Sequence, residues 1–182
     1  MNTPSVHLAT TSEEISERAH AARSKGGGRV ILVPVDFSFH SEAALVHACE
    51  LADIMSVAVM VLHVVHDPGE MPGYYSKLIK KKRVGRIQDT AAEAFDEFIV
   101  RVSAAHPKLK ALQEAERLMV VGLPVTRILE VVEELDPWMV VVGSQGRTGM
   151  QHLFIGSKAA QIVQLCPVPV TVVKSKKVKK KE

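Results

Sequence analysis

The chain has few aromatic side chains, two cysteines and no long apolar run. Phe, Trp and Tyr make up 4% of its 182 residues against 47% hydrophobic residues in all, so aliphatic side chains must build the core. Cys49 and Cys166 are too few and too far apart for a disulfide scaffold or a zinc site. No stretch approaches bilayer length, and no secretory signal pattern opens the chain. We therefore expect one cytoplasmic α/β domain with an aliphatic core.

Positive charge is concentrated at the C-terminus. From Lys174 onward, six lysines and Glu182 give a formal charge of +5, so the rest of this +3 chain carries −2. Such a tail can touch nucleic acid or anionic lipid, but it has no interleaved aromatics on which bases could stack. We expect residues 175–182 to be a basic disordered tail, with no specific nucleic-acid partner and no membrane partner.

The first 28 residues differ from the rest of the chain. They are polar and end in three consecutive glycines, Gly26 to Gly28, which favour a flexible joint. Thr11 and Glu14 have capping-box spacing ahead of a thin apolar stripe, which leaves a short docking helix open as an alternative. We expect residues 1–28 to be a flexible extension of a domain at 29–174.

Strand and helix patterns alternate between residues 29 and 174. The apolar patterns predict strands at 30–36, 57–65, 118–122, 138–142 and 168–173, and helices at 40–54, 87–102, 125–135 and 157–165. This alternation predicts an α/β fold with a doubly wound five-stranded parallel sheet of order 3-2-1-4-5. The first and fourth strands then lie side by side where the winding reverses, so Asp36 and Gly143 meet at the crevice where ligands bind.

A glycine-punctuated loop follows the fourth predicted strand. Gly143, Gly146 and Gly156 precede Ser157, with the spacing G-x-x-G-x9-G-S. Glycines let backbone N–H groups approach an anion closely, and a helix N-terminus adds partial positive charge. The spacing fits neither a Walker loop nor a dinucleotide fingerprint. It predicts a phosphate-binding loop of another kind.

This loop resembles the ATP-binding motif of the universal stress protein family. The resemblance extends in order through 30–38, 61–65, 121–124 and 167–173. It implies a three-layer sandwich similar to the adenine nucleotide alpha hydrolases, with ATP as its Mg²⁺ complex as the ligand. It also implies a homodimer joined through the strand at 168–173, although the N-terminal extension covering that edge is an alternative.

The resemblance also implies which residues contact the nucleotide. Pro34 and Val35 would border the adenine, Asp36, Phe37 and Ser38 would hold the nucleoside, and the backbone of Val64 would meet the adenine edge. Gly143, Ser144, Gly146, Arg147, Gly156 and Ser157 would surround the phosphates.

Each of these assignments has a simpler alternative. The sole role of Asp36 could be to support the start of the next helix, and the sole role of Val64 could be to fill the core. Arg147 could be solvated. His63 and His66 lack a third ligand, so no metal site is predicted.

The resemblance implies a nucleotide-dependent regulator of the stress response. An adenylate-forming or phosphoryl-transferring enzyme would need a carboxylate beside the phosphates, and residues 143–157 contain none. Slow ATP hydrolysis, with Asp36 near magnesium, stays open, and so does a dimeric scaffold that binds no nucleotide. We expect no dedicated catalytic residues and at most weak ATPase activity.

Overall fold

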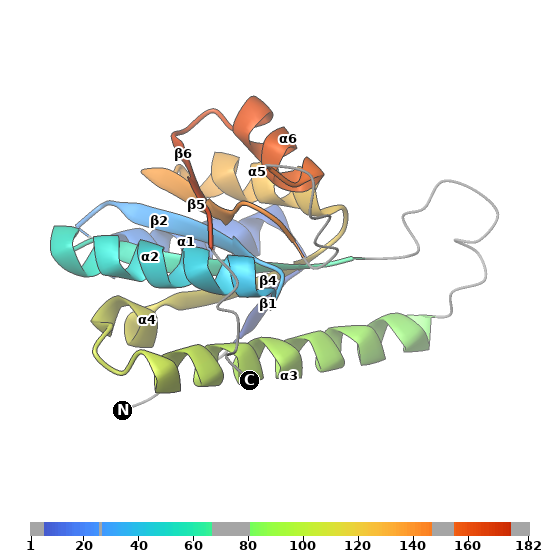
Figure 1. Ribbon diagram of the computed structural model, residues 1–182. Coiled ribbons are helices and arrows are strands. Elements are labelled where there is room, and N and C mark those ends of the chain that lie inside the picture. The colour runs from blue at the N-terminus through green and yellow to red at the C-terminus, as the bar shows by residue number, and fades with distance from the viewer. Residues whose placement is uncertain (1–5, 26, 67–80, 147–154, 176–182) are drawn as a thin grey trace.

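The sheet has six parallel strands in the order β1-β4-β3-β2-β5-β6 (Figure 1). The computed structural model describes residues 6–25, 27–66, 81–146 and 155–175. The strands are β1 His7–Ala9, β2 Val30–Val35, β3 Ala58–Val65, β4 Glu116–Val121, β5 Met139–Gly143 and β6 Val170–Val173. The helices are α1 Ser12–Lys25, α2 Phe39–Met55, α3 Lys81–Ala105, α4 Lys110–Glu114, α5 Pro124–Leu135 and α6 Ser157–Leu165.

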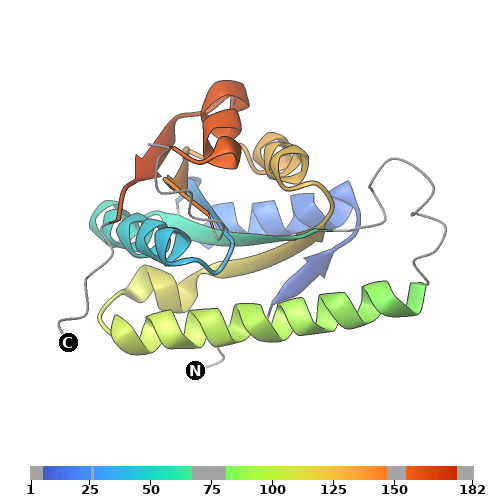
Figure 2. The ribbon, with the colours of Figure 1, turned by 45° about the vertical axis from the view of Figure 1, so that its right-hand side comes forward.

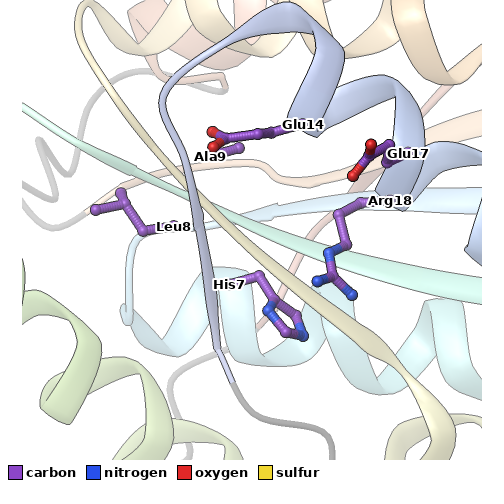
Figure 3. A pocket seen from close by; sticks show the side chains of 6 residues that line it. All are labelled: His7, Leu8, Ala9, Glu14, Glu17 and Arg18. Carbon is purple, nitrogen blue, oxygen red and sulfur yellow. The ribbon is translucent and has the colours of Figure 1, made fainter.

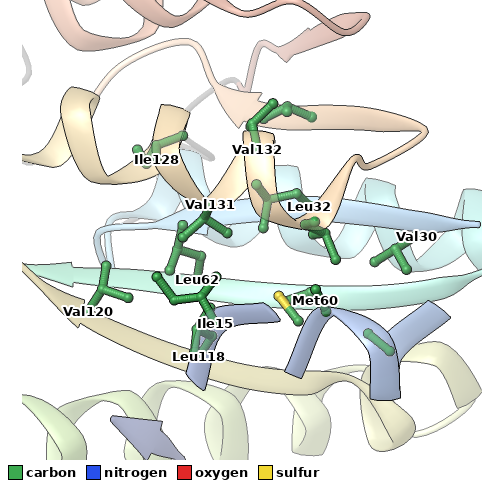
Figure 4. Packing of buried hydrophobic residues seen from close by; sticks show 14 of the residues in the cluster. Ile15, Val30, Leu32, Met60, Leu62, Leu118, Val120, Ile128, Val131 and Val132 are labelled. Atoms are coloured by element: carbon green, nitrogen blue, oxygen red, sulfur yellow. The ribbon is translucent and has the colours of Figure 1, made fainter. Parts of the chain in front are cut away.

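Helices cover both faces of the sheet, which makes a three-layer sandwich (Figure 2). Successive side chains of a strand point to opposite faces, so β2 sends Leu32 toward α1, α5 and α6 and Val33 toward α2, α3 and α4. Figure 4 shows the first of these clusters, in which Ile128 and Val131 of α5 pack over the strands. Because both faces are buried, the strands can be almost continuously aliphatic.

The predicted order of the five main strands is confirmed. β4, β3, β2, β5 and β6 lie in the predicted spatial order, and all described pairs are parallel. β1 is a short sixth strand that the sequence analysis did not predict. It pairs with the outer edge of β4, opposite β6.

The expectation of a flexible N-terminal extension is wrong for residues 7–25. β1 joins the sheet, and α1 packs against it through Ile15, Ala19 and Ala22, all fully or almost fully buried. The stripe is thin because two of its three residues are alanines, yet it is continuous at the spacing that one helix face requires. The extension also lies at the β4 edge and not over β6, which removes the alternative that it covers the proposed dimer strand.

A capping box starts α1, as the spacing of Thr11 and Glu14 predicts. The Glu14 N–H donates to the Thr11 hydroxyl at 3.2 Å, and the Glu14 carboxylate accepts from the backbone N–H groups of Thr10 and Thr11. These hydrogen bonds, that from the Thr10 backbone first, lower the pKa of Glu14 below its ordinary value of 4.5.

We expect the α1 cap to weaken in acid. A lowered carboxyl pKa in the folded state gives stability that is present above pH 4.5 and lost as the pH falls through the folded-state value. In Glu14→Gln the amide keeps an acceptor but does not titrate. Urea midpoints measured from pH 6 to pH 3 should therefore fall more steeply for the wild type than for Glu14→Gln, and parallel curves would contradict the role given to Glu14.

Pro34 lies just beyond the point where the pairing of β2 with β5 ends. The Val30 carbonyl accepts from the Trp138 N–H at 2.9 Å, so every second residue of β2, Pro34 included, directs its backbone toward β5. Proline has no N–H to continue that ladder. The two strands pair only at Ile31 and Leu32 and then separate toward their carboxyl ends, where a doubly wound sheet binds ligands.

Candidate functional site

The end of β2 carries a tightly hydrogen-bonded turn. The Asp36 carboxylate accepts from the backbone N–H and the hydroxyl of Ser38, at 3.1 and 2.6 Å. The Ser38 hydroxyl oxygen in turn accepts from the Ser41 N–H at 3.2 Å and so caps α2. Ser38 is therefore the helix cap, and Asp36 acts on the helix through Ser38. This network fixes the carboxylate just after the carboxyl end of β2.

Phe37 occupies a conformation that side chains rarely adopt. Its φ is +64°, and its ring stacks on that of His63 with centroids 4.1 Å apart. Phe95 and Phe98 of α3 lie at 5.8 and 5.4 Å from the same ring. The strained backbone is held by this aromatic packing, so the side chain has a clear structural role beside the nucleotide contact that the family resemblance implies.

Gly143 lets the start of α2 touch the end of β5. A Cβ atom at this position would lie 2.6 Å from the His40 carbonyl oxygen and 3.0 Å from the Ser41 nitrogen. Both neighbours are backbone atoms, which cannot move away as a flexible side chain can. A glycine is required here by the close approach of two elements, and this approach brings the Asp36 turn beside the glycine loop.

Gly146 and Gly156 bring three segments together. A Cβ at Gly146 would lie 2.9 Å from the Asp36 Oδ2 atom, so the loop backbone passes directly over that carboxylate. The Gly156 N–H donates to the Ser144 carbonyl at 2.8 Å, which holds the start of α6 against the same loop. The structure thus brings Asp36 and the glycine loop together at the carboxyl ends of β2 and β5, as predicted.

The first turn of α6 presents backbone N–H groups at this point. Gly156 is the N-cap and provides no side-chain hydrogen bond, and Ser157 begins the helix with an exposed side chain. An anion is favoured at such an end. Ser144 contributes less, because its N–H is already donated to the Val173 carbonyl and the residue is only 4% exposed.

Val64 lies beside the Asp36 turn at the end of β3. Its side chain packs against the core cluster of α5, as the simpler alternative predicted. The Val65 carbonyl accepts from Gly122 on the β4 side, so the backbone of Val64 points to the opposite side, toward β2. The last pair of β2 and β3 joins Val35 and His63, so Val64 stands where this ladder ends.

Part of the predicted loop falls outside the described residues. Arg147 lies in that part, so its predicted phosphate contact stays a prediction.

Two hollows occur in other places of the structure, one of about 210 Å³ beside β1 and one of about 330 Å³ at the amino ends of the strands. Neither is lined by the Asp36 turn. Within 6–66, 81–146 and 155–175, leaving out residue 26, no cluster of His, Cys, Asp and Glu could hold a metal ion, and no helix has the length and apolarity to cross a membrane.

Sequence reasoning missed two polar groups near the site. Ser41 is buried, and its hydroxyl donates to the Ser38 carbonyl at 3.0 Å and accepts from the Asp36 N–H at 3.3 Å. The serine pair three residues apart was the available signal. The Ser175 hydroxyl lies 2.8 Å from His40 Nδ1, which ties the chain after β6 to α2, and no local pattern announces this contact.

Comparisons with known proteins agree on one family. A sequence model of the Universal stress protein family matches residues 28–174. A universal stress protein of Methanocaldococcus jannaschii is 24% identical over 162 residues, covering 80% of this chain and 94% of the relative. A universal stress protein of Mycolicibacterium smegmatis is 28% identical over 144 residues, covering 79% of this chain and 45% of that longer protein.

Solved structures share the fold. The universal stress protein UspA from Lactobacillus plantarum has a TM-score of 0.65 at 20% identity and covers 80% of this chain and 97% of its own. A universal stress protein from Archaeoglobus fulgidus, solved in complex with dAMP, has a TM-score of 0.52 at 22% identity, covering 80% and 97%. Another was solved in complex with cAMP, with a TM-score of 0.54 at 20% identity, covering 81% and 98%.

Proposed function

The chain belongs to the universal stress protein family, and we propose that its crevice binds ATP as its magnesium complex. The observation that carries this proposal is the meeting of the Asp36 carboxylate, the Gly146 backbone and the start of α6 at the end of the sheet. Two members of the fold were solved with dAMP and cAMP, which supports an adenine nucleotide as the ligand.

The parts of the crevice suit the parts of a nucleotide. Asp36 would accept hydrogen bonds from the ribose hydroxyls, beside Phe37 and Ser38, and Pro34, Val35 and the Val64 backbone would border the adenine. Phosphates would lie over Gly143, Ser144, Gly146, Arg147, Gly156 and Ser157, where uncapped N–H groups of α6 and the helix dipole favour anions.

We propose that the protein works in the cytoplasm as a nucleotide-dependent regulator of the stress response. ATP would change which conformation, and so which partner surface, is populated, in proportion to its difference in affinity for the two states. The site offers no second carboxylate beside Asp36 among 143–146 and 155–157, so the proposal includes at most slow hydrolysis.

We also propose a homodimer through 168–173. β6 lies at an edge of the sheet with every residue half-buried, and Val163 and Leu165 of the adjacent helix are 45% and 57% exposed. An apolar parallel edge strand beside exposed aliphatic side chains favours pairing with a second copy. The carbonyls of Pro169 and Val173 accept from the β5 side, so the backbone of Val172 points to the free edge. The test is the mass in solution, which should halve when Val172→Pro removes a backbone donor from that edge.

Titration calorimetry with ATP and magnesium tests the site. A Cβ at Gly156 would meet its nearest neighbours, Gln145 Cα and the Ser144 carbonyl oxygen, at 3.5 and 3.6 Å, so Gly156→Ala fits. The two methyl groups of Gly156→Val would extend over the loop backbone where phosphates are proposed. We expect the alanine variant to bind like the wild type and the valine variant to bind at least tenfold more weakly. Folded wild-type protein that gives no saturable heat would contradict the proposal.

Asp36→Asn separates the charge of Asp36 from its structural role. The amide oxygen can still accept from Ser38, so the turn and the α2 cap are kept, but the acceptor for the ribose loses its charge. A hydrogen bond to a charged group contributes about 1.5–3 kcal/mol, so we expect ATP to bind roughly tenfold to a hundredfold more weakly. Equal affinity, with an unchanged melting temperature, would show that Asp36 only supports the turn.

A further inference from the structure

The outer edge of β4 is covered by a small separate unit. We call β1 and α1, His7–Lys25, the arm. It lies before residue 28, where the family match begins. Only three residues of the arm pair with the strand, His7 with Leu118, Leu8 with Met119 and Ala9 with Val120, whereas β4 runs from Glu116 to Val121. Without the arm, β4 would be an open edge of the sheet.

The arm also covers an apolar part of the sheet face. Ile15 lies against Leu118, Leu62 and Met60 in Figure 4, and each of these four side chains is at most 1% exposed. The other arm residues buried in this cluster, Ala9, Ala19 and Ala22, are small. Release of the arm would therefore expose an apolar face and a strand edge together, on one side of the molecule.

The attachment of the arm is slight. Its joint to β2 includes Gly27 and Gly28, both at positive φ, and a Cβ at either would meet no atom within 4 Å. Lys25 forms an ion pair with Glu116 at the start of β4, but the lysine side chain is 55% exposed. The arm is held by Ile15, three alanines, three strand pairs, the packing of α1 against α5 and one partly solvated ion pair.

The outer side of the arm is unsuited to further pairing. A hollow of about 210 Å³ beside β1 is lined by Glu14, Glu17 and Arg18 of α1, whose side chains are drawn in Figure 3. β1 has three residues, and a very short edge strand flanked by charges is a common way to stop sheets from joining edge to edge. The arm thus replaces the six-residue edge of β4 with a three-residue edge beside charged side chains of α1.

We propose that the arm inhibits self-association through β4, and that a second copy of this chain is the partner of the surface that it covers. The β4 edge already pairs with a strand of this same chain, and around a two-fold axis it can pair with β4 of another copy, in antiparallel orientation. The apolar face next to the edge, now under Ile15, would then adjoin its equivalent on the same side of the joined sheet.

Full-length variants that release the arm test this proposal. Ile15→Asp places a carboxylate in the buried position, whereas the matched control His20→Asp adds the same charge at an exposed position of α1. Light scattering without nucleotide should give at least twice the wild-type mass for Ile15→Asp at equal concentration, and the wild-type mass for the control. Because the comparison is with the wild type, it depends neither on ATP binding nor on the β6 dimer.

Amide hydrogen exchange completes the test. Fast exchange in residues 7–25 of Ile15→Asp, with β2 and β5 still protected and the mass equal to that of the wild type, would overturn the proposal. If Ile15→Asp unfolds the domain, the double variant His7→Pro/Leu8→Pro decides by the same criteria. Successive amides of a strand point to opposite sides, so this variant removes the donor toward β4 without placing a charge at Ile15.

Discussion

Gly143→Ala is expected to destabilise the protein by about 3 kcal/mol, at the upper end of what overpacking usually costs. The added Cβ would lie 2.6 and 2.7 Å from the His40 oxygen and carbonyl carbon, so the end of β5 and the start of α2 must move apart. That movement would also displace Ser41, which hydrogen-bonds to the Asp36 turn. We therefore expect nucleotide binding to be lost together with stability.

Urea unfolding monitored by circular dichroism gives the free energy for this comparison. Gly156→Ala is the matched control, because its φ is −66° and its new Cβ would be in ordinary van der Waals contact at 3.5 Å. We expect it to change the free energy of unfolding by less than about 1 kcal/mol. Equal effects of the two alanines would mean that the approach of α2 to β5 is looser than the structure has it.

Ile15→Ala is expected to lower the free energy of unfolding by about 3 kcal/mol, the usual cost of truncating a buried isoleucine. Ile15 is 1% exposed and is the largest side chain that α1 places in the core cluster. If residues 1–28 were a flexible extension, the same change would have almost no effect. The packed arm of the structure and the flexible extension expected from the sequence therefore predict different free energies of unfolding for Ile15→Ala, and they differ by most of the 3 kcal/mol.

The control for this substitution is Ile54→Ala on α2. Ile54 is 81% exposed, so its truncation should change the free energy of unfolding by less than about 0.5 kcal/mol. Both variants replace an isoleucine by alanine within a helix, so the difference between them reports burial alone. A cost below 0.5 kcal/mol for Ile15→Ala as well would contradict the packed position of α1.

Regular periodicity made most of the fold predictable. Strands such as Val30–Val35 and helices such as Pro124–Leu135 are specified by aliphatic runs, helical spacing and a proline at the helix start. The winding rules then placed Asp36 beside the glycine loop before any contact was known. The site was predictable to this extent because a doubly wound sheet has one position where both segments must meet.

What could not be predicted depends on contacts distant in sequence. Whether a weak helix such as α1 docks depends on the uncovered face of β4 and β3, which periodicity alone does not reveal. The left-handed conformation of Phe37 is stabilised by rings that follow about 60 residues later in the chain, in α3. The α4 helix was also missed, since five residues are too short for a periodic signal and Asp53 of α2 accepts from its first N–H groups.

The two-residue pairing of β2 with β5 divides the sheet into two parts. One part contains β1, β4, β3 and β2, and the other contains β5 and β6. The two parts are joined by the pairing of Ile31 and Leu32 with Met139 and Val140. Asp36 directly follows β2 of the larger part, and Gly146 follows β5 of the smaller part. A ligand that contacts both residues would link the two parts of the sheet, and its binding would set the angle between them.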